Sequence, residues 1–431
     1  MEGAYMVKII SAGAGERMQH LTHKFNDTTI RFVLHYPGIL NSDTLCKATR
    51  AVIEKIDILH SSFIVNSQSC HWKVNARYHT ADFFALVECE GNPMKVATSL
   101  SLEAVEYKDK CQMQVTMVQG DDTCAVIVRI SHLVVDGSDG KYLLQKLTES
   151  YRMVDENKNT EGLEVKNGSR SAMNAYRDLG IREISSLMKM PFHGVKTEYP
   201  FDDANAHGPL RVLRCTIPAE LLGQARHKAK KTNATVNDLL LTACYRSYAK
   251  TTGRNGVVSI AGMMDLRQHC KDAASEGLSN MSGGLSTTLE YEQESTFTDN
   301  LATIAHQTSE GKRNPLAGLD GMPLIHTATK TVPIWVLSQI ANIVYANMSL
   351  SLTNLGNISC DQLIMGGLKP VEGMFGGPLK RKPSVQVGVA SFDGTAELTI
   401  LGDFVSEDLE SVQTFLNGIY KEIELYLEED I

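Results

Sequence analysis

The chain has 431 residues, which exceeds the usual size of a single hydrophobic core, so two lobes of roughly 200 residues each are expected. Hydrophobic residues make up 43% and charged residues 21%, as in folded globular proteins, which excludes extended disorder. The net charge of -8 disfavours the basic surface that nucleic-acid binders need, so nucleic acid is not an expected partner.

The cysteines and the apolar runs bear on location. The nine cysteines show neither a CxxC pair nor a metal-ligand spacing, a usage typical of reduced thiols in a cytoplasmic protein. The amino-terminal segment has no apolar stretch of signal-peptide length, and no run of about 18 apolar residues occurs in the chain. We therefore expect a cytoplasmic protein with no membrane span and no bound metal.

The first half of the chain alternates between strand and helix patterns. The predicted elements are a strand over 28–37, a helix over 42–59, strands over 111–118 and 124–131, and a helix over 142–154. The turn signal Gly120-Asp121-Asp122 separates the two later strands and predicts an antiparallel hairpin. The second strand of this hairpin delivers His132 into a loop that precedes a helix.

Periodicity is lost between Asp155 and about Gly208, where we place a linker between two lobes. The second half then yields a strand over 210–217, helices over 218–230 and 235–248, strands over 257–264, 349–354, 385–390 and 398–401, and a closing helix over 406–427. The expected organisation is an amino-terminal lobe over 1–165, a linker over 166–208 and a carboxy-terminal lobe over 209–431.

The most informative motif is HxxxDG, formed by His132, Asp136 and Gly137 at the end of a predicted strand. Three apolar residues separate the His from the Asp, Gly137 allows a positive φ, and an amphipathic helix follows. His23 and Asp27 also match HxxxD, but no Gly follows and no strand precedes them. We treat that second copy as chance.

A histidine in this position suits proton transfer. Imidazole has an ordinary pKa of about 6.5, so its neutral form can take a proton from a hydroxyl or amine near pH 7 and later return it. The opposing interpretation of His132 is a hydrogen-bonded core histidine at a strand end. Asp136 either orients the ring directly or turns away and pairs with a distant arginine, and the residues alone leave both open.

These motifs resemble the superfamily of chloramphenicol acetyltransferase, peptide-synthetase condensation domains and plant and fungal acyl-CoA acyltransferases. The resemblance rests on Ser131–Gly137 (SHLVVDG), on Leu59–Phe63 and on Asn233–Ala243, which occur in the family's order. It implies an α/β (α+β) fold class: two chloramphenicol-acetyltransferase-like lobes, each a mixed, largely antiparallel sheet flanked by helices. A tunnel between the lobes would hold His132 at its middle.

The same resemblance assigns roles around the histidine. Asp136 would be structural and would form a salt bridge with Arg267, for which a solvated surface position is the alternative. An oxyanion formed on a thioester carbonyl needs hydrogen-bond donors. The family's Ser/Thr-Asn-x-Gly segment resembles the stretch with Thr353 and Asn354, and Ser282 lies in another polar glycine-rich stretch. Both stretches are also typical of ordinary loops.

The chain departs from the family patterns at two places. Condensation domains usually carry a second His immediately before the catalytic one, where this chain has Ser131, which favours ester or simple amide formation. Residues 374–378 are at most a degenerate counterpart of the plant-type Asp-Phe-Gly-Trp-Gly signature. The cations of 380–382 are either a phosphate contact for coenzyme A or a solvated loop.

The sequence therefore predicts an acyltransferase in which His132 is the general base. The expected donor is an acyl thioester, first of all acyl-CoA, the acceptor is a small alcohol or amine, and no cofactor is permanently bound. One alternative is a free-standing condensation enzyme that takes its acyl group from a phosphopantetheinyl carrier protein. Another is a non-catalytic relative that uses the tunnel to bind a ligand.

Overall fold

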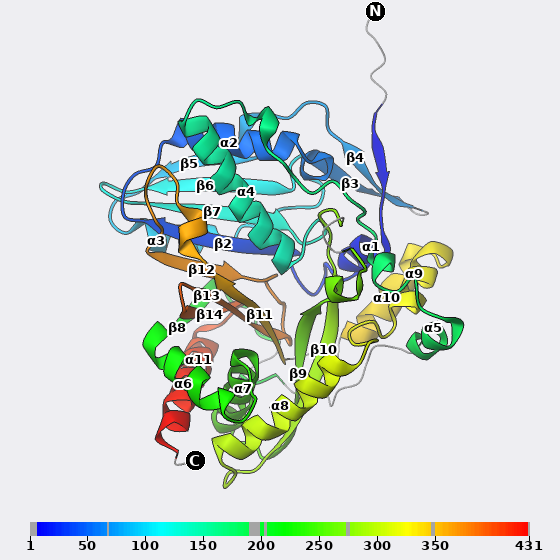
Figure 1. Ribbon diagram of the computed structural model, residues 1–431, viewed down its shortest axis with the longest axis vertical. Helices are drawn as coiled ribbons and strands as arrows, with labels where there is room; N and C mark the ends of the chain where they lie inside the picture. Colours follow the sequence, from blue (N-terminus) through cyan, green and yellow to red (C-terminus); the bar gives the residue numbers. More distant parts are fainter. Residues whose placement is uncertain are drawn as a thin grey trace, which may run out of the picture.

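A computed structural model describes residues 7–66, 69–188, 199–201, 205–272, 276–345 and 350–429. The chain forms two large sheets, of five and six strands, each flanked by helices, together with one small sheet (Figure 1). The predicted mixed α/β architecture with two helix-flanked sheets is confirmed. Within the described ranges, no helix is both long and apolar enough to cross a bilayer.

The first large sheet has the strand order β12-β2-β7-β6-β5. Its strands are β2 (Thr29–Tyr36), β5 (Phe84–Glu88), β6 (Met113–Gln119), β7 (Cys124–Ser131) and β12 (Glu372–Gly376). Successive side chains of a strand point to opposite faces of the sheet. Phe32 and Leu34 accordingly belong to the main core with α2 (Ser42–Glu54) and α4 (Gly137–Asp155), whereas Val33 packs with α3 (Pro93–Leu100). The predicted hairpin is present as β6 and β7.

The second large sheet has the strand order β10-β9-β11-β13-β14-β8. Its strands are β8 (Leu210–Ile217), β9 (Gly256–Asp265), β10 (Ser282–Tyr291), β11 (Leu350–Ile358), β13 (Val385–Phe392) and β14 (Thr395–Asp403). Its helices are α6 (Ala219–Lys230), α7 (Val236–Thr252), α8 (Phe297–Arg313) and α11 (Ser406–Glu428). Residues from all four helices share one core with this sheet.

The remaining elements lie around these two sheets. They are β1 (Ile9–Ser11), β3 (Ser61–Val65) and β4 (Cys70–Val74) of the small sheet, α1 (Ala14–Leu21), α5 (Ile181–Leu187), α9 (Met322–Thr331) and α10 (Ile334–Tyr345). Short 3-10 helices span Asp57–His60, Thr80–Asp82, Thr160–Gly162, Ala172–Ala175, Leu266–His269 and Cys360–Leu363. Helix α1 contacts α9 and α10, so the amino-terminal segment packs against helices from the second half of the chain (Figure 1).

One strand crosses between the halves of the chain. Strand β12, from the range expected to form the carboxy-terminal lobe, pairs antiparallel with β2, with Gly376 opposite Arg31. It also contacts β13 and β14 of the six-stranded sheet (Figure 1). The residues that follow β12 are therefore carried to the edge of the first sheet where β2 begins, close to the end of β7.

Candidate active site

The His132 loop, defined here as residues 132–136, connects the end of β7 to α4. The β2–β7 ladder reaches the pair Thr29↔Ser131, and the next backbone N–H, that of His132, donates to the Thr28 carbonyl at 2.7 Å. Leu133, Val134 and Val135 are fully buried, whereas His132 keeps part of its surface exposed. The three apolar side chains therefore anchor the loop in the core, and the imidazole stays at the strand end.

The hydrogen bonds of His132 identify its tautomer. Nδ1 lies 2.6 Å from the Val135 carbonyl oxygen, which can only accept, so Nδ1 carries the proton. Nε2 has no hydrogen-bond partner among the described residues and offers its lone pair. Burial lowers the pKa of His132 to about 4, with a smaller lowering from Lys380, against an upward effect of the Val135 carbonyl and Asp27. At neutral pH the ring is an uncharged base.

Asn280 also supports this loop, and the sequence interpretation did not single it out. Its Nδ2 donates to the His132 carbonyl oxygen at 3.2 Å, and its Oδ1 accepts the Ser282 backbone N–H at 3.2 Å. Nδ2 also lies 3.4 Å from His132 Nδ1, but both atoms are donors in this tautomer, so that contact is not a hydrogen bond. The segment before β10 is thereby tied to the His132 loop.

Asp136 turns away from the imidazole. It caps α4 by accepting the Asp139 backbone N–H at 3.0 Å, and its Oδ2 lies 2.6 Å from Arg267 Nη1. Gly137 does not adopt the positive φ that glycine allows. Glycine leaves room for Leu355 there, because an added Cβ would lie 2.4 Å from Leu355 Cδ1 and would require that side chain to shift.

Arg267 occupies a buried position in the 3-10 helix that follows β9. Its Nη2 contacts Asp139 Oδ2 at 2.7 Å and the Ser279 carbonyl at 3.0 Å, and its Nη1 contacts Asp265 Oδ1 at 3.1 Å. Burial alone would lower the pKa of Arg267, but the carboxylates of Asp136 and Asp139 raise it overall. Arg267 is 8% exposed, so the surface alternative for this arginine does not hold.

The sequence interpretation missed Asp139, which the turn-like string Gly137-Ser-Asp-Gly140 concealed. Its carboxylate is fully buried and accepts from Lys166 Nζ at 3.0 Å and from the Ser279 backbone N–H at 2.8 Å, besides Arg267. Asp136 and Asp139 thus contact the two terminal nitrogens of the guanidinium, Nη1 and Nη2 respectively. We call Arg267, Asp136, Asp139 and Asp265 the arginine cluster.

The three residues predicted to stabilise an oxyanion or line the tunnel lie in different places. Ser282 begins β10 and is joined to the His132 loop through Asn280. Thr353 Oγ1 accepts from Gln386 Nε2 at 2.9 Å, and Asn354 Nδ2 contacts Asn237 Oδ1 at 3.4 Å. The described contacts join neither Thr353 nor Asn354 to His132, so their roles stay predictions.

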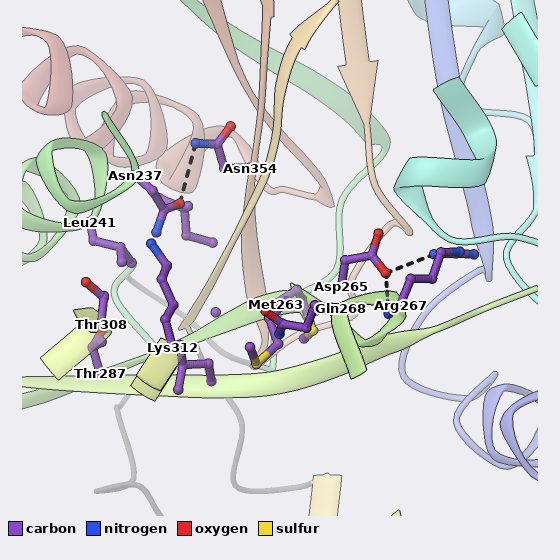
Figure 2. Close-up of a pocket in the computed structure, with 14 residues that line it drawn as sticks. Asn237, Leu241, Met263, Asp265, Arg267, Gln268, Thr287, Thr308, Lys312 and Asn354 are labelled. Carbon is purple, nitrogen blue, oxygen red and sulfur yellow. Dashed lines mark hydrogen bonds and ion pairs between the residues drawn. The ribbon is translucent and has the colours of Figure 1, made fainter. Parts of the chain in front are cut away.

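A cavity of about 520 Å³ opens beside the arginine cluster. Strands β9 and β11 pair at Ser351↔Ala261 and Leu352↔Gly262, and both strands contribute to the cavity wall from these pairs onward. Figure 2 shows Asn354 and Asn237 at one end and Asp265 and Arg267 at the other. His132, Thr353 and Ser282 are not among the lining residues of this cavity, and the tunnel through His132 stays a prediction.

Comparison with known proteins identifies the fold. Neither a family model nor a curated protein matches the sequence. Among solved structures, the TRI3 trichothecene 15-O-acetyltransferase from Fusarium sporotrichioides superposes with a TM-score of 0.73 at 11% identity, covering 97% of this chain and 95% of that chain. The chain has the condensation-domain and acetyltransferase fold.

Domains of peptide synthetases give the same result. The first condensation domain of the CDA synthetase matches with a TM-score of 0.68 at 13% identity, covering 98% of this chain and 97% of that domain. The epimerization domain from the third module of tyrocidine synthetase B matches with a TM-score of 0.68 at 14% identity over 98% of both chains. The resemblance predicted from SHLVVDG is thus confirmed at the level of the fold.

Proposed function

We propose that the protein is an acyltransferase that moves an acyl group from a thioester to an alcohol or amine, with His132 as general base. The observation that carries this proposal is the imidazole itself: partly exposed at a strand end, neutral at pH 7, with Nε2 unoccupied among the described residues. The fold supports the class, because the neighbours are an acetyltransferase and domains of peptide synthetases.

The reaction follows from the tautomer. Nε2 removes the proton of the acceptor O–H or N–H while the acceptor atom attacks the thioester carbonyl carbon. The carbonyl electrons move onto oxygen, return as the C–S bond breaks, and the leaving thiolate receives the proton from Nε2. The Val135 carbonyl, bound to Nδ1, fixes the ring orientation through both steps. No metal or redox group takes part in this sequence of steps.

Acyl-CoA is the proposed donor, and a carrier-protein thioester is the second candidate. The acetyltransferase neighbour favours transfer to an oxygen acceptor, whereas the condensation-domain neighbour favours a donor linked to a carrier protein. Ser131, which stands in place of a second histidine, favours the acetyltransferase type of reaction. Turnover of matched acyl groups presented on coenzyme A and on a phosphopantetheinyl carrier protein distinguishes the two donors. A non-catalytic binding protein would release thiol from neither.

The first test removes the base. His132→Ala is expected to lower kcat/KM by about 100-fold or more, the usual effect of losing a general base. Thiol release from a panel of acyl-CoAs with alcohols and amines, followed by mass spectrometry of the products, measures it. His227→Ala, an exposed histidine on α6, is the matched control and should behave as wild type. Unchanged turnover in folded His132→Ala protein would discard the mechanism.

The pH profile provides a second test of the same residue. Burial lowers the pKa of His132 to about 4, and the imidazolium formed below that pH cannot accept a proton. The value of kcat/KM should therefore stay level as the pH falls from 7 to about 5 and decline only through about 4. A decline centred near 6.5, the ordinary histidine value, would show that the working base is a solvated imidazole.

A further inference from the structure

The chain that follows β12 places Lys380 next to the segment that holds His132. Lys380 forms an isolated antiparallel bridge with Asn26, and the flanking residues pair through Asp27 N–H to the Leu379 carbonyl at 3.2 Å and Arg381 N–H to the Phe25 carbonyl at 2.9 Å. The same short segment provides the Thr28 carbonyl that accepts the His132 N–H. Residues 26–28 therefore lie between Lys380 and the His132 loop.

The three cations at 380–382 do not form one patch. Lys382 is ion-paired with Asp408 in the interior of the second lobe, with both side chains at most 2% exposed. Arg381 is exposed. The Lys380 side chain is partly buried and has no hydrogen-bond or ion-pair partner among the described residues. The phosphate-contact interpretation of the tract thus loses Lys382, and Lys380 is left with a separate environment.

Among the residues that the structure describes, no carboxylate forms an ion pair with Lys380. Asp27 is the acidic group whose charge acts on it, but Asp27 is already ion-paired with the fully buried Arg31. Asp27 Oδ1 also accepts the backbone N–H groups of Leu379 at 2.9 Å and Thr29 at 3.2 Å. A partly buried ammonium without a dedicated anion is costly unless something negative joins it during function.

The environment of Lys380 contains His132 and Asp27, the latter ion-paired with Arg31. The charge of Lys380 lowers the pKa of His132, which agrees with the backbone bridge that places Lys380 beside the segment bound to the His132 loop. Burial lowers the pKa of Lys380 to about 8, and Asp27 opposes that shift. Lys380 is therefore mostly protonated at pH 7 and loses its charge as the pH rises through about 8.

We propose that Lys380 is a catalytic residue that donates a hydrogen bond from Nζ to the oxyanion of the acyl-transfer step. This inference rests on the acyltransferase function proposed above. The oxyanion forms on the oxygen of the carbonyl group that the deprotonated acceptor attacks, so it develops within a few ångströms of the base, next to the segment 26–28 that Lys380 is bridged to. As the C=O bond opens, the oxygen accepts from the Nζ–H group; as the C–S bond breaks, C=O reforms and Lys380 keeps its proton.

The test uses acyl thioesters of N-acetylcysteamine, which carry neither phosphate nor net charge, with water and with the best acceptor from the screen. Lys380→Met should lower kcat by about 100- to 1,000-fold, the usual effect of removing an oxyanion donor, and leave KM within about twofold. Lys380→Arg should recover part of the loss. The neighbouring Arg381→Met is the matched control, because it removes an exposed cation from the same tract.

The pH profile separates catalysis from structure. Wild-type kcat should decline above about 8, and this basic limb should be absent in Lys380→Met. The acid limb of the Lys380→Met variant should move upward from about 4, because the variant lacks the nearby positive charge that lowers the pKa of His132. An effect confined to KM, or unchanged kcat in folded Lys380→Met and Lys380→Gln proteins, would overturn the assignment.

The two proposals fail in different ways. If wild type releases no thiol from any probe, the acyltransferase function fails and Lys380 loses its role with it. If His132→Ala is inactive while the Lys380 variants keep wild-type kcat and both pH limbs, the function stands and this inference alone is wrong.

Discussion

Two groups of charged or titratable side chains lie near the His132 loop, and they differ in how fully their members are paired. In the arginine cluster, Arg267 contacts three carboxylates, and Asp136 and Asp139 also accept backbone N–H groups from the second half of the chain. Around the imidazole, His132 Nε2 and Lys380 Nζ have no partner within the part of the chain that the structure describes. The charges of the arginine cluster are ion-paired, although Arg267 Nε has no hydrogen-bond partner among the described residues, whereas His132 and Lys380 have no ion-pair partner there.

This difference separates structure from chemistry. Buried charges are stable in a fold when each is paired and hydrogen-bonded, and such a group has little capacity left for a ligand. A neutral base with a free lone pair and an ammonium without a dedicated carboxylate retain that capacity. Asp136 is therefore assigned to holding the loop, and the reacting groups are expected at His132 and Lys380.

The largest expected effect on stability comes from removing the arginine of the arginine cluster. Arg267→Ala leaves Asp136 and Asp139 buried without their guanidinium, and it should lower the free energy of unfolding by about 3–5 kcal/mol. Urea denaturation followed by circular dichroism measures the change. Arg226→Ala, an exposed arginine on α6, should alter the free energy by less than about 0.5 kcal/mol. Equal midpoints for both variants would show that the cluster does not hold the fold.

A smaller effect tests whether the burial of a carboxylate, rather than the number of carboxylates around Arg267, determines its contribution to the free energy of unfolding. Asp139 and Asp265 both contact Arg267, but their side chains are 0% and 42% exposed. Asp139→Asn should cost about 2–3 kcal/mol, the scale of a charged buried hydrogen bond, and Asp265→Asn less than about 1 kcal/mol. Denaturation of the two variants under identical conditions gives the comparison. Equal losses would mean that the cluster behaves as a surface network.

Elements with a clear periodic pattern of hydrophobic residues within their own sequence were predictable. The hairpin ending at Ser131 and the closing helix α11 lie close to their expected bounds, because burial of one face imposes a local pattern, whereas helix α4 begins at Gly137 instead of the expected position 142. Strand β12 was missed, since Glu372–Gly376 is short and glycine-rich and gains its partner only when β2 lies beside it. Its pairing is a property of the fold and leaves no local signal.

The candidate site divides in the same way. The motif and the family resemblance led to His132, Asp136 and Arg267, and the structure joins the latter two directly. Asp139 looked like a turn residue and Lys380 like one cation of a tract, because their surroundings come from the other half of the chain. Asn280 had no signal beyond a polar glycine-rich stretch. Side-chain partners distant in sequence required the structure.

The smallest expected effect concerns Asn280, which contacts the His132 loop, and it is measured in the pH profile of kcat/KM. In Asn280→Asp, a carboxylate oxygen replaces Nδ2, which lies 3.4 Å from His132 Nδ1, while the other oxygen still accepts the Ser282 N–H. A nearby anion favours the imidazolium, so the acid limb of kcat/KM should move upward from about 4, with only a few-fold loss at pH 7. Asn255→Asp adds the same charge at an exposed position before β9 and should leave the limb in place. If both variants keep the wild-type limb, a charge at position 280 does not act on the ring and the prediction is wrong. If the Asn280 variant alone shifts the limb, the protonation of His132 responds to a nearby charge, as expected for a ring that has no ion-pair partner among the described residues.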